Sequence, residues 1–528
     1  MIRIRDISLP PDGDMARLVQ AAARQLRISP NEIKQLDLKR RSVDARKKND
    51  VRIIYTVDVA VKGREDKILK MAHCARASLA QDPVYHVPQP RSIPAQRPVI
   101  VGFGPAGMFA ALVLSMAGLR PLVLERGQDA KARHAAVLQF WKTWTLDPEC
   151  NVQFGEGGAG TFSDGKLNTG VKNERIGWIL EQFAGAGASA DILYDAKPHI
   201  GTDELVTVVQ NLRETIIHYG GEVRFGVKVT GLVTEDGRVT GVRAGDDEIT
   251  AEVVILAEGT NSMLSERCLG NARPKADQMA VGIKEVFELP SDVIEDRFLL
   301  PEGEGAAMLF VGDCTKGSVG GGFLYTNKDS ISLGLVATIE ELSTSGTTIY
   351  QAMEDFKHHP AVAPIIRDAT MVEHSGHMVS EGGYDMIPEY VYDGCLIAGD
   401  AAMLCMNLGY QVRGMDLAVA SGQFAAEAAC AAIDGGNVSA QALALYRTML
   451  EDSFVIKDMK TFRAWPQTME HWDRMFTEYP TMVAEVFNAM FVVDGEPQQH
   501  LTKRIIPVVK QRGLLRLAKE VRGALKAL

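Results

Sequence analysis

Two hydrophobic periods run along the first 94 residues and set them apart from the rest of the chain. Alternating apolar and polar residues are typical of a strand, whereas apolar residues three and four apart are typical of a helix. The segments with one or the other pattern are, in order, 2–5, 14–28, 33–42, 51–61 and 65–79. This order predicts a small β-α-β-β-α module over residues 1–94, closed by a proline-rich linker that begins at Val87.

The next segment, 98–126, predicts a strand, a helix and a second strand, with a glycine-rich turn before the helix. The turn reads Gly102-Phe-Gly104-Pro-Ala-Gly107, which is the spacing of a dinucleotide-binding βαβ unit. Gly102 permits the tight turn, Gly104 lets the backbone approach a diphosphate, and Gly107 lets the helix pack closely on the strands. The sequence therefore predicts a nucleotide cofactor.

The start of this helix is expected to bind the diphosphate. Pro105 and Ala106 open the helix, whose free N–H groups and dipole favour negative charge. Glu125 ends the second strand, 23 positions after Gly102, where a carboxylate can accept both ribose hydroxyls of an adenosine. Its neighbour Arg126 and the more distant Val229 are also expected to contact the cofactor. The spacing favours FAD or NAD over NADP.

A second signature, near residue 400, distinguishes FAD from NAD. The apolar run from residue 394 ends in Gly399-Asp400, and the segment after it contains Gly409, Gly414 and Met415. This arrangement resembles the second flavin fingerprint of the p-hydroxybenzoate hydroxylase and geranylgeranyl reductase superfamily. The resemblance implies that Asp400 holds a ribityl hydroxyl. It also implies that backbone amides near Gly414 face the flavin pyrimidine, which carries negative charge when reduced.

Between the two signatures, residues 253–262 resemble the strand and turn that close such an FAD domain, with Ala257 and Gly259 in the turn. The three signals predict an α/β flavoprotein whose Rossmann-like FAD-binding domain has an α+β substrate domain inserted into it. The expected domains are the N-terminal module (1–94), the discontinuous FAD-binding domain (95–270 and 385–440), the substrate domain (271–384) and a C-terminal helical region with a basic tail (441–528).

A glycine-rich stretch, 154–167, cannot build a hydrophobic core and is expected to lie against the flat flavin ring. Ser163, Asp164 and Lys166 are weak candidates for catalytic groups near flavin N5 or a substrate, although the flavin itself is the expected catalytic group. A glycine-rich connection with solvated charges is the alternative. This stretch and the N-terminal module resemble bacterial FAD-dependent dehydrogenases over about residues 1–245.

The second half resembles another family, the electron-transfer-flavoprotein:quinone oxidoreductases, which include the FixC proteins. The segments that carry this likeness begin at Met279, Gly320, His359 and Cys405, and it spans about residues 250–528. It implies an FAD that takes electrons from an electron-transfer flavoprotein and passes them towards quinone, with iron–sulfur chemistry in a fused domain or a separate ferredoxin-like subunit. The seven cysteines are scattered, so no cluster, zinc site or disulfide is expected in this chain.

The two resemblances meet near residues 245–260, so the chain is interpreted as a mosaic within one FAD domain. Three functions stay open. The first is electron transfer between a protein donor and quinone or a ferredoxin-like acceptor. The second is a dehydrogenase or reductase of a small molecule, and the third is a flavin-bound interaction protein without turnover. No second complete GxGxxG unit is visible, so rapid direct reduction by NADH is not expected.

Charge is distributed unevenly along the chain. The net charge is −10, yet residues 501–528 contain eight Lys or Arg and one acid, Glu520, a net charge of +7. The apolar residues that fall on one helical face of this tail are Leu514, Leu517, Ala518, Val521, Leu525 and Leu528. One interpretation is a helix that pairs with the acidic body. The other is a reversible contact with anionic lipid or an acidic electron-transfer partner.

The remaining signals are weaker. The N-terminus has no apolar signal core, so a cytoplasmic protein is expected, with a peripheral place at the inner membrane face if the tail binds lipid. The basic run 39–48 has no interleaved aromatic residues, which favours a solvated hairpin over nucleic-acid binding. No metal site is expected, because the histidines at 358, 359, 374 and 377 are predicted at surface and loop positions.

Overall fold

The computed structural model describes residues 1–528 except 48, 83, 163–173, 197–199, 201, 410, 411, 494, 496 and 498. The chain divides into two compact units. The first comprises Met1–Val87 and Gly160–Thr215, and the second comprises Pro88–Ala159 and Ile216–Leu528. This division groups 160–215 with the N-terminal module, whereas the sequence analysis placed these residues in the FAD-binding domain.

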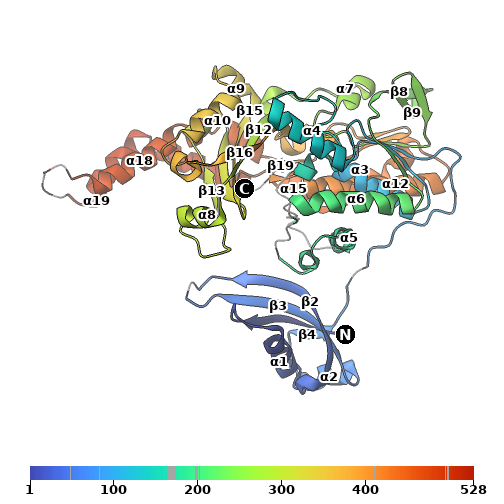
Figure 1. The fold of residues 1–528 in the computed structure, drawn as a ribbon, viewed down its shortest axis with the longest axis horizontal. Helices are drawn as coiled ribbons and strands as arrows, with labels where there is room; N and C mark the ends of the chain where they lie inside the picture. The colour runs from blue at the N-terminus through green and yellow to red at the C-terminus, as the bar shows by residue number, and fades with distance from the viewer. Residues whose placement is uncertain are drawn as a thin grey trace. The chain divides into compact units, whose positions relative to one another are not determined.

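Residues 1–87 of the first unit form an antiparallel four-stranded sheet in the order β2-β3-β1-β4, with helices α1 and α2 (Figure 1). The elements are β1 (Ile2–Leu9), α1 (Met15–Leu26), β2 (Ile33–Asp44), β3 (Arg52–Val61), α2 (Glu65–Ala72) and β4 (Ala77–Leu79). They confirm the predicted β-α-β-β-α order and add one short strand. The helix expected over 65–79 ends at Ala72 because His73 is left-handed, with φ of 47°.

Alternate residues of these strands form the core of the first unit. Ile2 and Ile4 of β1 meet Val57 and Val59 of β3 and Leu18 of α1, and all five are fully buried. On the opposite face of the sheet, Arg3 makes two hydrogen bonds of 2.8 Å to Asp58. The period-2 pattern thus separates an apolar face from a charged one.

Backbone pairing explains why residues 160–215 belong to the first unit. Arg41 of β2 donates its N–H to the Tyr194 carbonyl at 2.7 Å, and Ala196 donates to the Arg41 carbonyl at 3.0 Å. The Arg41 guanidinium also bonds to the Asp195 carboxylate at 2.7 Å. The elements in this segment are α5 (Glu174–Gly185), η3 (Ala190–Leu193) and the greater part of α6 (Thr202–His218).

The second unit is built on a six-stranded sheet in the order β17-β18-β11-β5-β6-β7. Its strands are β5 (Val99–Val101), β6 (Leu122–Leu124), β7 (Glu222–Arg224), β11 (Val254–Leu256), β17 (Val391–Tyr392) and β18 (Cys395–Ile397). The four pairings from β18 through β11, β5 and β6 to β7 are parallel, and β17 joins antiparallel. Parallel strands carry binding residues at their carboxyl ends, so both predicted signatures reach the same edge.

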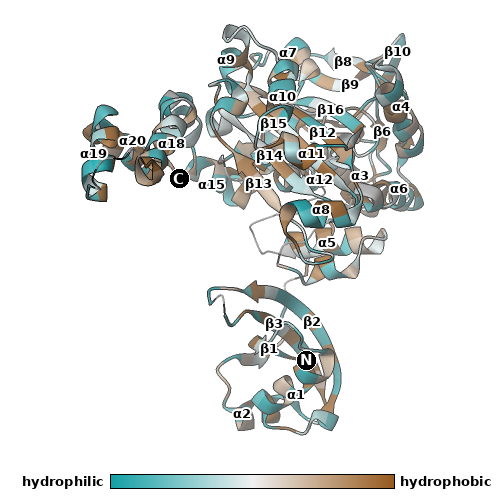
Figure 2. Cartoon of the chain, turned by 60° about the vertical axis from the view of Figure 1, so that its left-hand side comes forward, coloured by the Kyte–Doolittle hydropathy of each residue, from teal (hydrophilic) through white to brown (hydrophobic). Residues whose placement is uncertain are grey.

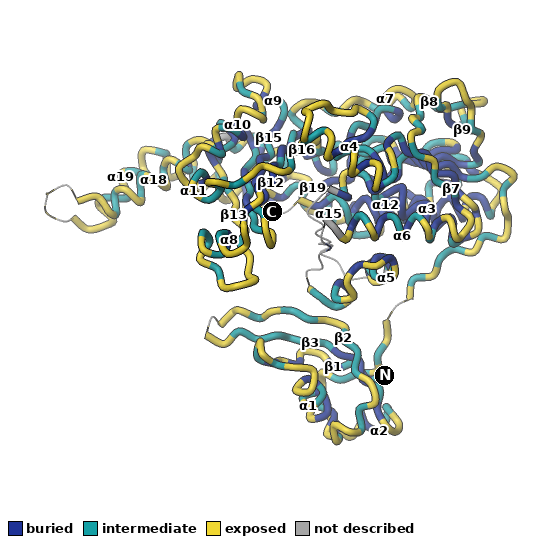
Figure 3. Tube along the Cα trace, in the orientation of Figure 1, coloured by how far each residue is buried: buried dark blue, intermediate teal, exposed yellow. Residues whose placement is uncertain are grey.

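Two helices pack together beside this sheet, α3 (Pro105–Met116) and α12 (Met415–Asp434). Ten consecutive residues of α3, from Ala106 to Ser115, are buried, which explains why this helix is apolar on all sides. The tube in Figure 3 is accordingly dark blue along both helices. Other elements of this part are α4 (Ala130–Thr143), η2 (Gly158–Phe162), β8 (Val229–Glu235), β9 (Arg238–Ala244), β10 (Asp247–Thr250) and α7 (Met263–Leu269).

A second sheet of five strands lies within residues 279–380, in the order β13-β14-β15-β12-β16. Its strands are β12 (Met279–Glu288), β13 (Ala307–Phe310), β14 (Gly320–Thr326), β15 (Ser330–Thr338) and β16 (Thr370–Ser380), and the helices are α8 (Ser291–Phe298), α9 (Ile339–Thr344), α10 (Ile349–Lys357) and α11 (Ala363–Ile366). Leu324, Leu333 and Phe356 lie in its buried core. The loop position predicted for His374 and His377 is wrong, because both lie on β16 and pair with β12.

The chain returns to the FAD-domain sheet and ends in helices. The connecting elements are η4 (Ala276–Gln278), η6 (Gly383–Met386), η7 (Gly399–Ala402), β19 (Met406–Asn407) and β20 (Val412–Arg413). The last helices are α13 (Ala440–Leu443), α14 (Leu445–Asp452), α15 (Phe454–Thr461), α16 (Trp465–Glu470), α17 (Asp473–Phe476), α18 (Glu478–Phe491), α19 (Leu501–Gln511) and α20 (Leu514–Ala527). Within the described residues, no helix combines the length and apolar character needed to cross a membrane.

Candidate functional site

The glycine turn after β5 is packed so closely that two of its positions accept only glycine. Gly102 has φ of 98°, and a Cβ there would lie 2.3 Å from the Ala257 carbonyl oxygen at the end of β11. A Cβ on Gly107 would lie 2.0 Å from the Gly102 carbonyl oxygen. These contacts hold the start of α3 against two strand ends, as the fingerprint predicts.

Gly104 differs from its neighbours because the space beside it is open. Among the described residues, a Cβ on Gly104 would meet a single atom within 4 Å, the Gly158 Cα at 3.7 Å. Gly104 is the N-cap of α3, Pro105 is its first residue, and no side chain caps this end. Free N–H groups at Ala106 and Gly107 therefore face a space that no described side-chain acceptor fills, which suits a diphosphate.

Glu125 at the end of β6 is occupied by backbone groups. Its carboxylate accepts N–H groups from Phe103 at 2.8 Å, Gly127 at 2.9 Å and Gly155 at 3.0 Å. The residue is 4% exposed, so in this conformation the carboxylate ties the glycine turn to the loop at Gly155. Its predicted contact with ribose hydroxyls stays a prediction.

The other residues expected near the ribose lie next to Glu125. Arg126 donates from Nε to the Glu149 carboxylate at 2.7 Å, and its guanidinium lies 4.2 Å from the centre of the Phe154 ring. Val227 donates its N–H to the Glu125 carbonyl at 2.9 Å, so the start of β8, with Val229 as its first residue, runs beside the end of β6. Arg126 and the start of β8 thus lie beside the carboxyl end of β6.

Asp400 lies where the second signature meets the first helix. A Cβ on Gly399 would lie 2.8 Å from the Ala106 Cβ of α3 and 3.5 Å from the Ala418 Cβ of α12. The Thr260 hydroxyl donates to Asp400 at 3.3 Å. Burial raises the pKa of Asp400 to about 6, and the Thr260 hydroxyl acts in the opposite direction. A ribityl hydroxyl that donates to this carboxylate would favour its charged form further.

A second free helix end lies beside Asp400. Gly414 is the N-cap of α12, Met415 is its first residue, and no side chain caps this end. The Cβ position of Gly414 is 3.6 Å from the Cys405 Sγ and 4.0 Å from Asp400 Oδ1. A Cβ on Gly422 would lie 2.0 Å from the Ala106 carbonyl oxygen, so α12 and α3 touch through their backbones. The uncapped starts of helices α3 and α12 thereby lie close to the Asp400 carboxylate.

The remaining predicted positions are less closely tied to this centre. Gly409 lies in the segment between β19 and β20, where its Cβ position is 3.7 Å from Trp465 Cζ2. Gly259 follows Ala257 in a left-handed turn with φ of 77°, and its Cβ position has no neighbour within 4 Å. The candidates Ser163, Asp164 and Lys166 lie outside the described residues.

Several polar contacts of the site were not predicted from the sequence. Thr260 binds Asp400, and Ser262 donates its hydroxyl to the Ala401 carbonyl at 2.9 Å. Glu381 accepts a hydrogen bond of 2.8 Å from the Asn407 side chain. Thr260 directly follows the predicted Gly259 turn, and Glu381 precedes a pair of glycines, so both positions carried a local signal.

The residues present fit FAD. The space beside Gly104 at the free start of α3 can take the diphosphate, Asp400 can accept a sugar-chain hydroxyl, and the free start of α12 can face the electron-rich pyrimidine. A mononucleotide would leave one of the two helix ends unused. The arrangement therefore suits a dinucleotide with an extended chain between its two ring systems.

Comparison with known protein families gives three matches. Residues 465–528 match the C-terminal domain of the ETF-QO/FixC family, and residues 279–379 match the ubiquinone-binding domain of ETF-QO. Residues 1–60 match a domain of unknown function, DUF8436. The ubiquinone-binding match coincides with the five-stranded sheet, and the C-terminal match begins at α16.

Curated relatives match most of the chain. A probable electron transfer flavoprotein-quinone oxidoreductase, YdiS of Escherichia coli, is 42% identical over 434 residues, which cover 81% of this chain and 97% of the relative. Protein FixC of the same organism is 39% identical over 80% of this chain and 96% of the relative. The predicted family resemblance is confirmed. It covers more of the chain than expected, because a match over 81% of the chain must include residues before 250. The family likeness therefore does not begin at the junction expected near 245–260.

A solved structure supports the fold. A geranylgeranyl bacteriochlorophyll reductase-like protein from Thermoplasma acidophilum superposes with a TM-score of 0.51 at 14% identity, covering 81% of this chain and 99% of that protein. At this identity the likeness concerns the fold alone. It confirms the predicted α/β class with a Rossmann-like domain of the geranylgeranyl reductase type.

Proposed function

The chain belongs to the electron transfer flavoprotein-quinone oxidoreductase/FixC family and is an FAD-dependent oxidoreductase, and we propose that it passes electrons from a reduced electron-transfer flavoprotein to a quinone. The observation that carries the proposal is the 42% identity to a probable oxidoreductase of this kind over 97% of its length. The match of residues 279–379 to a ubiquinone-binding domain supports quinone as the acceptor.

The residues of the site have distinct tasks in this proposal. The N–H groups at the start of α3 bind the diphosphate, and Gly104 keeps the approach open. Asp400 orients the sugar chain through a hydrogen bond, and the start of α12 stabilises negative charge through its N–H groups and dipole. Bound FAD supplies the electron chemistry, accepting two electrons and giving them up again. The protein supplies position, electrostatics and exclusion of water.

We further propose the domain roles that the sequence predicts. The part of the predicted FAD-binding domain (95–270 and 385–440) that lies in the second unit is proposed to hold FAD, because 160–215 group with the N-terminal module. The quinone side is assigned to 271–384, and the contact with redox partners to 441–528. A separate ferredoxin-like subunit also belongs to the proposal. It is supported by the sequence, in which the seven cysteines are scattered and form no run of the spacing that binds an iron–sulfur cluster.

Anaerobic mixing of the FAD-loaded protein with a reduced electron-transfer flavoprotein tests the donor. The bleaching of the flavin absorbance of the acceptor should be rapid and should saturate with donor concentration. Bleaching by NADH should be slower by about tenfold or more, equal to at least about 1.4 kcal/mol in activation free energy, because no second nucleotide-binding unit is recognised. Fast, saturable bleaching by NADH alone would instead favour the small-molecule dehydrogenase. Failure to bleach with any donor would favour the interaction protein without turnover.

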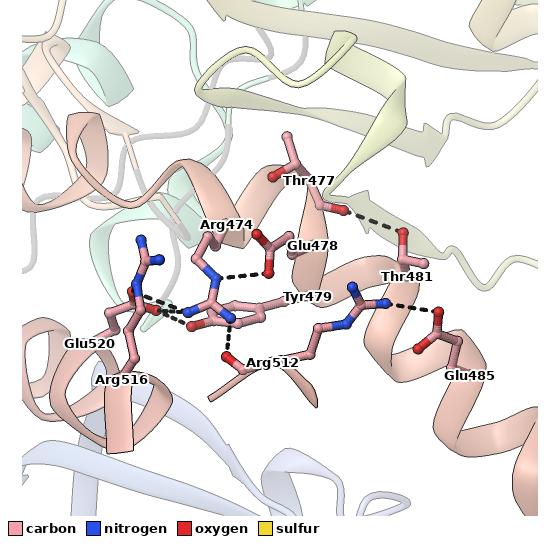
Figure 4. Close-up of polar contacts among 9 residues, drawn as sticks. All are labelled: Arg474, Thr477, Glu478, Tyr479, Thr481, Glu485, Arg512, Arg516 and Glu520. Carbon is pink, nitrogen blue, oxygen red and sulfur yellow. Dashed lines mark hydrogen bonds and ion pairs between the residues drawn. The ribbon is translucent and has the colours of Figure 1, made fainter. Parts of the chain in front are cut away.

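A second proposal concerns the basic tail, and the packing of α20 supports it. Tyr479 donates its hydroxyl to Glu520, and Arg474 and Arg516 pair with the same carboxylate (Figure 4). The buried residues of α20 are Ala524 and Ala527. Two of its leucines are largely exposed, Leu515 at 90% and Leu525 at 73%. Figure 2 shows hydrophobic and hydrophilic segments alternating along α19 and α20.

This exposed apolar surface is surrounded by basic residues, so we propose a reversible contact with anionic lipid. Arg512 pairs with Glu485 at 2.8 Å. Among the described residues, Lys519, Arg522 and Lys526 of α20 make no ion pair with an acid. Each cation near an anionic surface contributes about 1 kcal/mol, and leucine burial adds about 1.5–3 kcal/mol per side chain. The contact should therefore weaken with salt.

The lipid contact is tested with Leu515→Asp combined with Leu525→Asp. Truncation is avoided, because loss of Glu520 would leave Arg474 and Tyr479 without this partner. Co-sedimentation with phosphatidylserine vesicles at low salt should fall by about tenfold or more, since the variant lacks the two leucines that would be buried in the lipid. Met71→Asp, at a position 65% exposed on α2 of the first unit, is the matched control and should bind as the unchanged protein does. Equal binding by the double variant would show that α20 is a structural cap.

A further inference from the structure

Glu381 is a buried carboxylate with one polar side-chain contact. It directly follows β16, is 9% exposed, and donates its backbone N–H to the Gln278 carbonyl at 2.8 Å. Its Oε1 accepts a hydrogen bond of 2.8 Å from the Asn407 side-chain amide. Among the described residues no cation pairs with this carboxylate, although a buried charge is costly unless it is paired. Its ionisation is therefore finely balanced.

A continuous row of contacts links Glu381 to the cofactor-binding residues. Asn407 lies in β19, which pairs with β20, and β20 leads into Gly414 at the start of α12. Cys405, two residues before Asn407, has its Sγ 3.6 Å from the Cβ position of Gly414. That position is 4.0 Å from Asp400 Oδ1. Cys405 lies within electrostatic range of both carboxylates, because the pKa of its thiol is raised by burial and also by the charges of Asp400 and of Glu381. Negative charge added at the start of α12 is therefore expected to act on Glu381 as well.

The neighbouring titratable groups reinforce this sensitivity. Burial raises the pKa of Glu381 to about 7; the Asn407 amide acts against this shift, and the charge of Glu341 on α9 adds to it. Burial also raises the pKa of the Cys405 thiol, which therefore stays neutral. The other charged or titratable side chains on the surrounding elements are Asp277 of η4, Glu340 of α9, Glu470 of α16, and Tyr384 and Asp385 of η6. Arg413 of β20 pairs with Asp416 of α12 and Asp458 of α15. Asp385 is paired with Arg463 at 2.7 Å. Close to neutral pH, Glu381 is thus poised between its two forms.

We propose that Glu381 takes up one proton when the flavin site is reduced and releases it when the site is reoxidised. The inference rests on the proposed placement of the flavin pyrimidine at the start of α12. Added negative charge there disfavours a second negative charge on Glu381, so the carboxylate oxygen gains a proton from solvent. The two electrons come from the reduced electron-transfer flavoprotein and leave to quinone, and no other bond of Glu381 changes. Proton uptake by Glu381 would thereby offset the negative charge that reduction adds at the start of α12, and proton release would follow when the site is reoxidised.

The test is a reductive titration of the FAD-loaded protein with dithionite and mediators at pH values from 6 to 9. Below pH about 7, Glu381 is protonated in both redox states and adds no pH dependence. Between this pH and the higher pKa that Glu381 has in the reduced state, reduction should bring one extra proton, so the reduction equilibrium changes by an extra tenfold per pH unit. This corresponds to about 30 mV for a two-electron couple. The reduced-minus-oxidised infrared spectrum at pH 8 should contain the carbonyl band of a protonated carboxyl group.

Glu381→Gln has the shape of the protonated acid and should lose both the extra slope and the band. Glu340→Gln, at an exposed acid of neighbouring α9, is the control and should keep both. Asn407→Ala removes the donor that favours the charged form, so the break in slope should move to higher pH.

The inference is overturned if the unchanged protein has no break between pH 6 and 9, or if slope and band persist in Glu381→Gln. If the Glu381→Gln protein does not bind FAD, the Asn407→Ala protein provides the test. A break in slope at the same pH as in the unchanged protein would then contradict the inference. Dithionite replaces the protein donor and no quinone is added. A negative result in this titration therefore does not affect the proposed electron donor and acceptor. If the proposed donor or acceptor is wrong instead, the titration still tests proton uptake by Glu381.

Discussion

Gly104→Val is expected to yield a folded protein that purifies without FAD. Valine at this position places branched carbons where the diphosphate must approach the free N–H groups of α3. Gly104 has φ of −78°, which valine can adopt, and its Cβ position has only the Gly158 Cα within 4 Å. Loss of two charge-assisted hydrogen bonds at about 1.5 kcal/mol each would weaken FAD binding by about 100-fold or more.

The measurement is the flavin-to-protein absorbance ratio of the purified variant, together with its circular dichroism. Asp400→Ala should also reduce FAD content, since it removes the acceptor beside both helix starts. Gly177→Val is the matched control, because its Cβ position in α5 has no neighbour within 4 Å and lies in the other unit. A soluble, folded Gly104→Val protein that kept full FAD occupancy would show that the βαβ assignment is wrong.

Lys357→Met is expected to destabilise the five-stranded-sheet region by about 3–5 kcal/mol, because it leaves a buried carboxylate without its cation. Lys357 Nζ lies 3.0 Å from Glu285 Oε2, and His374 Nδ1 lies 3.2 Å from Glu285 Oε1. The Glu285 side chain is 1% exposed. Burial acts to raise the pKa of Glu285, but the contacts with His374 and Lys357 outweigh it and hold the pKa below its usual value.

Unfolding in urea, followed by the fluorescence of the nearby tryptophans, measures this loss. Glu285→Leu combined with Lys357→Met should recover much of the stability, because both charges are then absent. The depressed pKa means that ionised Glu285 stabilises the fold above its unfolded-state pKa of 4.5, and this contribution is lost as pH falls through the lower folded-state value. A single variant as stable as the unchanged protein at pH 7 would mean that the ion pair is not needed.

The parts of the site that could be predicted from the sequence are those governed by local chain geometry. Gly102 and Gly107 were identifiable because a tight turn and a close helix–strand contact allow only glycine, and the structure supplies contacts of 2.3 and 2.0 Å at these positions. The apolar strands before Gly102 and Asp400 have a short buried pattern, so the order of elements in the FAD domain followed from the sequence.

The contacts that escaped prediction join distant segments. The Glu125 carboxylate accepts the N–H of Gly155, 30 residues later, a contact that no spacing rule could indicate. Glu381 and Asn407 are 26 residues apart and meet only because β16 ends beside the β19–β20 hairpin. The apolar stripe of α20 was recognised, but which helix face is buried depends on Arg474 and Tyr479 holding Glu520.

Quinone reduction by the enzyme after its flavin has been reduced tests the central claim most directly. The protein is first bleached anaerobically with one equivalent of reduced electron-transfer flavoprotein and is then mixed with a soluble ubiquinone analogue. The account predicts that the flavin absorbance returns fully, that one quinol forms per flavin, and that apoprotein from Gly104→Val forms none. If the reduced flavin survives an excess of quinone, or if quinol forms equally fast with the apoprotein, electron transfer through this site to quinone is contradicted.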